Sequence, residues 1–138
     1  MPIMFMIDLE VLNLISFKKT IKVWIDTDET LIFSKLAVNG TQISRIQCIM
    51  QPEGTLLIGD ILPFRKKRDY CKGYGSIMMA ELLKYASQIG IHTIRGNLSL
   101  VDSDHKSRLH AFYKKHGFEI IQYDTPDDLF YGEVIKKL

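Results

Sequence analysis

The stretch RDYCKGYGS, residues 68–76, places cations and glycines directly ahead of a helix-like pattern, and this combination suits the binding of an anion. The first turn of a helix has N–H groups without intrahelical acceptors, and the helix dipole adds positive potential there. Gly73 and Gly75 have no side chains, so a phosphate could approach the backbone closely. Lys72 and the basic run at residues 65–68 add positive charge. The stretch therefore predicts a site for a phosphate-bearing ligand, with a tight turn and a solvated basic loop as the alternative.

The spacing of the glycines excludes two common phosphate-binding motifs. A nucleoside-triphosphate loop needs G-x-x-x-x-G-K-[ST], which is absent from the sequence. A dinucleotide fingerprint needs a third small residue three positions after Gly75, where Met78 stands. The phosphate-bearing ligand must therefore be of another kind.

The cysteines, Cys48 and Cys71, are predicted to be free thiols because we expect a chain that is not secreted, and because no C-x-x-C spacing is present we expect no metal site. Cys71 lies among cations ahead of the helix, where the pKa of a thiol falls and its nucleophilicity rises. A thiol enzyme is therefore an alternative, although no residue can be assigned as its base.

The composition is that of an ordinary globular protein. The chain has 138 residues, of which 46% are hydrophobic and 25% charged, so we expect a single domain over residues 1–138. The net charge of +2 and the confinement of the cations to one loop do not favour a nucleic-acid partner. The apolar start MPIMFMI lacks a basic leader and is followed by Asp8 and Glu10. We therefore expect a cytoplasmic chain without a membrane partner.

The first half of the chain is predicted to be rich in strands. Ile21, Val23 and Ile25 alternate along one face, and Asn39-Gly40 joins two strand-length runs as a tight hairpin. For residues 3–17, a strand and a short helix both fit the apolar spacing. The run TLLIGDIL, which begins at Thr55, is nearly unbroken and is typical of a central strand covered on both faces.

Helices and strands alternate in the predicted second half. An apolar stripe predicts a helix from Gly75 to Ile89, ended by Gly90. The elements expected after it are a strand at residues 91–100, a helix at 104–116, and closing strands at 118–123 and 129–135. A strand-helix-strand unit implies a parallel pair with a right-handed crossover. The sequence therefore predicts an α+β fold with a mixed sheet flanked by helices.

A second motif, AFYKKHGFE at residues 111–119, follows the glycine loop on the second predicted helix. It resembles the FY-x-x-x-GF signature of the GNAT superfamily of N-acetyltransferases, and Tyr70–Gly75 is similar to that family's acetyl-CoA pyrophosphate motif, Q/R-x-x-G-x-G/A. The resemblance covers residues 54–123. It implies acetyl-CoA as co-substrate and a sheet that splays open near Ile61 and Leu62, with the pantetheine arm in the gap.

The resemblance implies that backbone amides of residues 70–75 hold the pyrophosphate. The implied cofactor-binding residues are Ile61, Leu62, Arg68, Tyr70, Cys71, Lys72, Gly73, Tyr74, Gly75, Ser76 and Lys106. Tyr70 stands where the family has Gln or Arg, and Arg68 or Lys72 could compensate for it. Lys106 replaces the asparagine that is frequent at the start of the second helix.

The family's usual chemistry, direct attack of a substrate amine on the acetyl thioester, implies two catalytic residues. Tyr113 matches the acid that protects the departing thiolate, because a phenol of ordinary pKa, about 10, is protonated at neutral pH. A buried amphipathic role in the core is its alternative. Asp60, near the end of the candidate central strand, is the candidate base, with apolar neighbours that would raise its pKa. It could instead accept backbone hydrogen bonds.

The acceptor side departs from the family pattern. The first 50 residues do not show the pair of helices that commonly form the acceptor wall. The pocket for the unidentified amine must therefore be built differently, or by a partner subunit in a homodimer. A non-catalytic CoA-binding module is the main alternative function, and a nucleic-acid binder using residues 65–68 is a further one.

Overall fold

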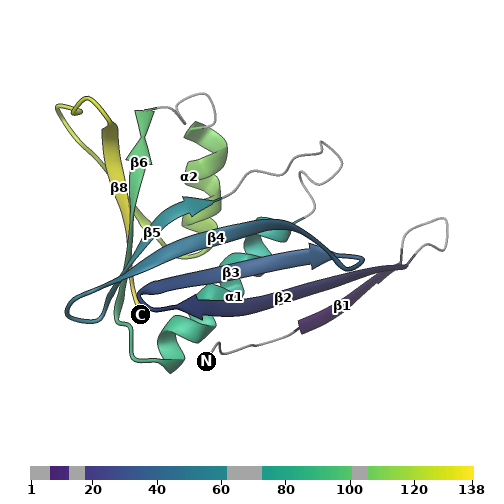
Figure 1. The fold of residues 1–138 in the computed structure, drawn as a ribbon. Helices are drawn as coiled ribbons and strands as arrows, with labels where there is room; N and C mark the ends of the chain where they lie inside the picture. The colour runs from purple at the N-terminus through teal and green to yellow at the C-terminus, as the bar shows by residue number, and fades with distance from the viewer. Residues whose placement is uncertain (1–6, 13–17, 62–72, 101–105) are drawn as a thin grey trace.

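The computed structural model describes residues 7–12, 18–61, 73–100 and 106–138. They form a sheet of eight strands in the order β1-β2-β3-β4-β5-β6-β8-β7, accompanied by helices α1 and α2 (Figure 1). The bounds are β1 Ile7–Leu12, β2 Lys18–Asp28, β3 Leu31–Val38, β4 Thr41–Gln51, β5 Thr55–Ile61, α1 Tyr74–Gln88, β6 Thr93–Ser99, α2 Lys106–Lys115, β7 Glu119–Gln122 and β8 Phe130–Lys137. The predicted α+β fold with a mixed sheet is confirmed. Neither described helix is long and apolar enough to cross a membrane.

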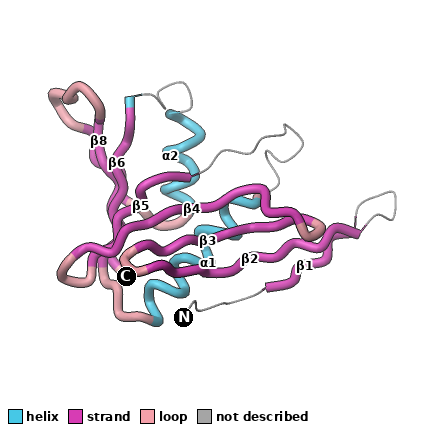
Figure 2. Tube along the Cα trace, viewed as in Figure 1, coloured by secondary structure: helices cyan, strands magenta, loops and turns pink. Residues whose placement is uncertain are grey.

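The first half, β1 to β5, is an antiparallel meander. Figure 2 shows these strands in magenta, joined one after the other. The predicted hairpin at Asn39-Gly40 is confirmed, with positive φ angles of 51° and 84°. Of the two interpretations of residues 3–17, the strand is confirmed for Ile7–Leu12, which pairs with β2. No helix lies before Tyr74 in the described part of the chain.

Both helices lie on the same side of the sheet, and the core is packed between them and that face (Figure 1). The predicted alternation in β2 is confirmed, since Ile21, Val23 and Ile25 are buried while their neighbours are half-buried. In β5, Leu56 and Ile58 are buried but Leu57 is not. The prediction that this strand is covered on both faces is therefore wrong for the elements described, which cover one face.

α1 is held on the sheet by its apolar face and by a buried polar contact with β3. The Ser34 hydroxyl on β3 donates to the Met78 carbonyl oxygen across 2.8 Å. Three buried residues of α1, Tyr74, Glu81 and Tyr85, were not part of the predicted apolar stripe. Ile89, which was, is 40% exposed, because the helix ends at Gln88 and Ile89 is its C-cap.

The sheet splays in its middle, as predicted. β5 and β6 pair in parallel from Thr55↔Thr93 to Ile58↔Gly96. Beyond that point β5 follows β4 to Ile61, whereas β6 follows β8 to Ser99. Figure 1 shows the two strands diverging, with α2 beside the arm formed by β6 and β8.

A β-bulge in the pairing of β4 with β5 determines which way Asp60 faces. The register passes from Cys48↔Ile58 to Gln47↔Asp60, so Gly59 is the extra residue. Without the bulge, Asp60 would share the helix-covered face with Ile58, because side chains two apart in a strand point the same way. With it, Asp60 faces the opposite side, which we call the open face.

Candidate functional site

The N-terminus of α1 begins at a glycine with room for a side chain that it does not have. Gly73 caps the helix at φ 79° without a side-chain hydrogen bond, and the first turn contains no acidic residue. The first helical bond runs from the Ile77 N–H to the Gly73 carbonyl, 3.1 Å, so the earlier N–H groups have no intrahelical acceptor. A Cβ added to Gly73 would meet no heavy atom within 4 Å. These features fit the close approach of an anionic group.

Lys115, at the end of α2, brings a cation to this helix terminus. Its ammonium group donates to the Ser76 hydroxyl across 3.1 Å. Sequence reasoning missed Lys115. The sequence feature that could have indicated Lys115 is its position three residues after Phe112, which places both side chains on one side of α2. Phe112 is the residue whose ring faces the start of α1.

Gly75 has a packing role of its own. A Cβ there would lie 3.2 Å from Cε1 of Phe112, so the Phe112 ring would have to shift by a few tenths of an ångström to admit a larger residue. α2 is therefore seated against the first turn of α1 through Phe112 and Lys115. Tyr74, another predicted binding residue, is buried in the core, which leaves its backbone and not its ring for ligand contact.

Tyr113 lies where the sheet splays. Its side chain is 5% exposed, and its ring packs edge-on against Phe112 and Phe118, with centroids 5.6 and 5.2 Å away. A Cβ added to Gly96 would lie 3.9 Å from the Tyr113 hydroxyl and 3.6 Å from Cβ of Ile58. Because Ile58↔Gly96 is the last parallel pair, the phenol is at the base of the gap on the helix side.

The two predicted residues at the end of β5 face opposite sides of the sheet. Asp60 is exposed on the open face, opposite Gln47, so the apolar surroundings expected around its carboxyl are not found. Ile61 is half-buried and packs against the core on the helix side. The structure thus places the candidate acid, Tyr113, and the candidate base, Asp60, on the two faces flanking the splay.

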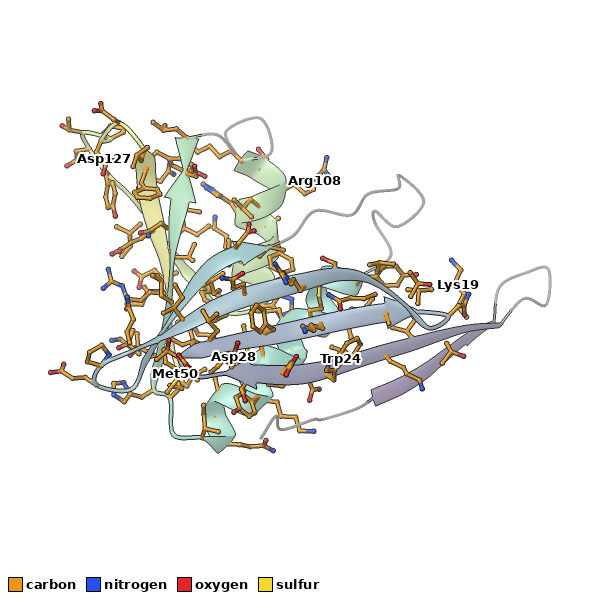
Figure 3. The ribbon with its side chains drawn as sticks, viewed as in Figure 1. Lys19, Trp24, Asp28, Met50, Arg108 and Asp127 are labelled. Carbon is orange, nitrogen blue, oxygen red and sulfur yellow. The ribbon has the colours of Figure 1, made fainter. Side chains whose placement is uncertain are left out.

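Lys106, at the start of α2, contacts β8. Its ammonium nitrogen lies 4.8 Å from the ring centroid of Tyr131, whose hydroxyl is 2.9 Å from Nε2 of His110. Burial and the neighbouring Lys106 and Lys114 lower the pKa of His110. His110 and Tyr131 were not predicted as a pair, because the contact depends on how α2 packs on β8. Arg108 projects from α2 into solvent (Figure 3).

The remaining predicted cofactor-binding residues lie outside the described residues: Leu62, Arg68, Tyr70, Cys71 and Lys72. The other cysteine, Cys48, is a free thiol in the core, and burial raises its pKa to about 12. Cys48 therefore stays protonated and unreactive at neutral pH. Within the described ranges, no group of His, Cys, Asp and Glu side chains is arranged to hold a metal ion.

Glu81 is a buried carboxyl on α1, with 2% of its surface exposed. Its Oε1 atom has no hydrogen-bond partner in the described part of the structure. Burial raises the pKa of this carboxyl, and the nearby Lys84 ammonium offsets part of the rise. The folded chain therefore keeps the proton to a higher pH than the unfolded chain does. The free energy of unfolding consequently falls as pH rises through that interval.

We expect Glu81→Gln to raise the melting temperature at neutral pH by a few degrees, because the amide has no charge to bury. Near pH 3, below the ordinary Glu pKa of about 4.3, the carboxyl is protonated in both states, and the variant and the unchanged protein should melt alike. Thermal melts across this pH range check the expectation. Glu119→Gln, an exposed change on β7, is the control. A lower melting temperature for Glu81→Gln at neutral pH would show that the carboxylate stabilises the fold.

The chain belongs to the acetyltransferase (GNAT) family, whose sequence model matches residues 8–118. The fold is that of solved N-acetyltransferases. The PaiA N-acetyltransferase of Thermoplasma acidophilum, solved with coenzyme A, is 21% identical with a TM-score of 0.62, and the match covers 79% of this chain and 62% of that one. A Bacillus subtilis acetyltransferase, also solved with coenzyme A, is 16% identical with a TM-score of 0.61. That match covers 80% of this chain and 78% of the other.

A third similar structure is the ribosomal-protein-S18-alanine N-acetyltransferase of Escherichia coli. It is 16% identical with a TM-score of 0.60, and the match covers 79% of this chain and 68% of that chain. No curated protein matches the sequence. The family and the fold are therefore established, and the recognition of the family from its two motifs is confirmed.

Proposed function

We propose that the protein binds acetyl-CoA and transfers the acetyl group to the amine of an acceptor by direct attack. One observation carries the proposal: α2 contacts the first turn of α1 through Lys115 and also places the Tyr113 hydroxyl at the splay. A single helix thus connects the terminus that we propose to bind the anion to the phenol at the gap. Membership of the GNAT family and the coenzyme A in two similar structures support the cofactor.

The described residues suit the pyrophosphate of this co-substrate. The backbone N–H groups from Gly73 to Ser76 would donate to the phosphate oxygens, and the Lys115 ammonium would add a positive charge beside them. Gly73 leaves the space that a phosphate needs. Acetyl-CoA supplies the thioester, whose acyl carbon the acceptor amine attacks.

Proton transfers on the two faces of the sheet complete the reaction. The acceptor ammonium loses a proton to Asp60 on the open face, directly or through water, and becomes nucleophilic. As the new C–N bond forms and the C–S bond breaks, the Tyr113 hydroxyl donates a proton to the departing sulfur. The nitrogen, still cationic after the attack, loses its second proton to solvent, the Tyr113 phenolate regains a proton from solvent, and Asp60 releases the proton that it took. The products are therefore the acetylated amine, the free thiol of CoA and one proton.

A screen of amines for thiol release from acetyl-CoA tests this function. We expect at least one acceptor to release thiol in proportion to acetylated product, at a rate well above that without acceptor. Parallel thermal melts report acetyl-CoA binding, because a ligand of the native state raises the melting temperature. Binding without thiol release for any amine would favour the non-catalytic CoA-binding module.

A further inference from the structure

The open face of β2, β3 and β4 carries charged and aromatic side chains in adjacent rows, which we call the open-face cluster. Directly opposite residues of antiparallel strands share a face, so the pairing gives the rows. Trp24, Lys35 and Arg45 form one row, and Asp26, Phe33, Gln47 and Asp60 form the next. Trp24 is labelled in Figure 3 on β2. The cluster thus extends from the middle of the meander to Asp60 beside the splay.

Phe33 orients the two cations of the cluster. The Lys35 ammonium lies 5.2 Å from its ring centroid, and the Arg45 guanidinium carbon lies 5.3 Å from it. Lys35 also donates to Asp26 across 2.8 Å, so its charge is compensated. Arg45 has no carboxylate partner among the residues described. A guanidinium positioned in this way presents its planar set of donors to a ligand.

Asp60 is the group of opposite charge to Arg45 on the open face. It is exposed, and no ion pair joins it to a cation in the described ranges. Because Asp60 is opposite Gln47, Arg45 is its diagonal neighbour, with Cα atoms roughly 7–8 Å apart. Within the described residues, the Asp60 carboxylate and the Arg45 guanidinium are therefore two unpaired charges of opposite sign within the span of a small molecule.

We propose that the acceptor is an amine that also carries a carboxylate. Its ammonium group is received by Asp60, and its carboxylate is bound by the guanidinium of Arg45, a pairing that allows two parallel hydrogen bonds. The proposal rests on the proposed acetyl transfer, because it assigns the acceptor side of that reaction. No described helix precedes Tyr74, so N-terminal helices do not form an acceptor wall in the described part of the chain. In this proposal, side chains of the strands bind the acceptor instead.

Pairs of acceptors that differ only by a carboxylate test the proposal. The pairs are phenylalanine and phenethylamine, histidine and histamine, and lysine and cadaverine, each assayed by thiol release from acetyl-CoA. We expect the amino acid to have the higher kcat/KM in at least one pair, by about tenfold or more, because a hydrogen-bonded charge pair is gained. Equal or lower kcat/KM for the amino acid in every pair overturns the proposal.

Variants at Arg45 test whether this side chain causes the preference for acceptors that carry a carboxylate. We expect Arg45→Gln to remove the preference for the carboxylate, so that kcat/KM for the amino acid comes within about twofold of kcat/KM for the matching plain amine in the same variant. Arg45→Lys should restore part of the preference, because it keeps the charge without the planar donors. Lys137→Gln, a loss of the same charge at the far end of β8, is the control and should keep the full preference. Unchanged preference in Arg45→Gln also overturns the proposal.

A binding measurement separates this proposal from the proposed function. If no amine releases thiol, the proposed acetyl transfer fails, and thermal melts with phenylalanine, histidine or lysine in the presence of CoA then decide the acceptor surface. Stabilisation of the unchanged protein that is lost in Arg45→Gln supports a carboxylate-binding open face. No stabilisation, or equal stabilisation of both proteins, rejects it.

Discussion

Tyr113→Phe should lower turnover by about 10²- to 10⁴-fold while leaving acetyl-CoA affinity nearly unchanged, if the phenol is the general acid. The ring, which packs against Phe112 and Phe118, is retained in the variant. Only the hydroxyl at the base of the gap is removed. Because a proton donated to the departing sulfur acts in the transition state, kcat and kcat/KM should fall together. Steady-state kinetics with a saturable acceptor, alongside calorimetry with acetyl-CoA, measure both quantities.

Tyr85→Phe is the matched control for this variant. Tyr85 is a second buried tyrosine, on α1, so its change reports the cost of losing a buried hydroxyl away from the splay. We expect Tyr85→Phe to keep its turnover. Full activity in Tyr113→Phe would instead return Tyr113 to a packing role in the core.

Gly73→Ala should weaken acetyl-CoA binding by about tenfold or more. The added methyl group would project into the open space at the N-terminus of α1, where a phosphate must approach the backbone. The φ angle of 79° also disfavours any residue with a Cβ, so the cap itself would shift. Calorimetric titration with acetyl-CoA gives the change in Kd.

Gly90→Ala separates the backbone strain from the loss of the phosphate site. Gly90 follows the other end of α1, has a φ angle of 85°, and likewise has no heavy atom within 4 Å of an added Cβ. Both variants should therefore lose about 1–2 kcal/mol of stability. Only Gly73→Ala should lose affinity. Equal affinities in the two variants would mean that Gly73 serves the turn alone.

The sequence predicted the features that depend on local patterns. Asn39-Gly40 predicted its hairpin because both residues accept positive φ angles, and Gly40 is found at 84°. The strand-helix-strand unit and the two motifs predicted the splayed sheet, which opens after Ile58↔Gly96. These predictions needed only residue types, their spacing and a resemblance.

The features that sequence did not predict depend on contacts between distant segments. The period-two pattern of β5 places Asp60 on the buried face with Ile58, and only the bulge at Gly59 turns it to the open face. That bulge is defined by pairing with Gln47 and Cys48, which no local pattern reveals. The same pairing of β4 with β5 places Arg45 diagonally opposite Asp60 on the open face.

Positions that depend on how the helices pack could likewise not be predicted from the local sequence. Lys115 is a surface cation by its local pattern, and its bond to Ser76 exists because α2 packs on the first turn of α1. Glu81 interrupts an apolar stripe that alone would predict only hydrophobic contacts. The contact of Lys115 and the burial of Glu81 both depend on tertiary packing, which the local sequence pattern does not determine.

Calorimetric titration of the unchanged protein with acetyl-CoA tests the central claim most directly. We predict saturable binding at one site per chain, accompanied by a rise in the free energy of unfolding of about 2.7 kcal/mol when the ligand is at 100 times its Kd. Absence of both heat and stabilisation at millimolar acetyl-CoA would contradict the assignment of the α1 terminus and the splay as a CoA site.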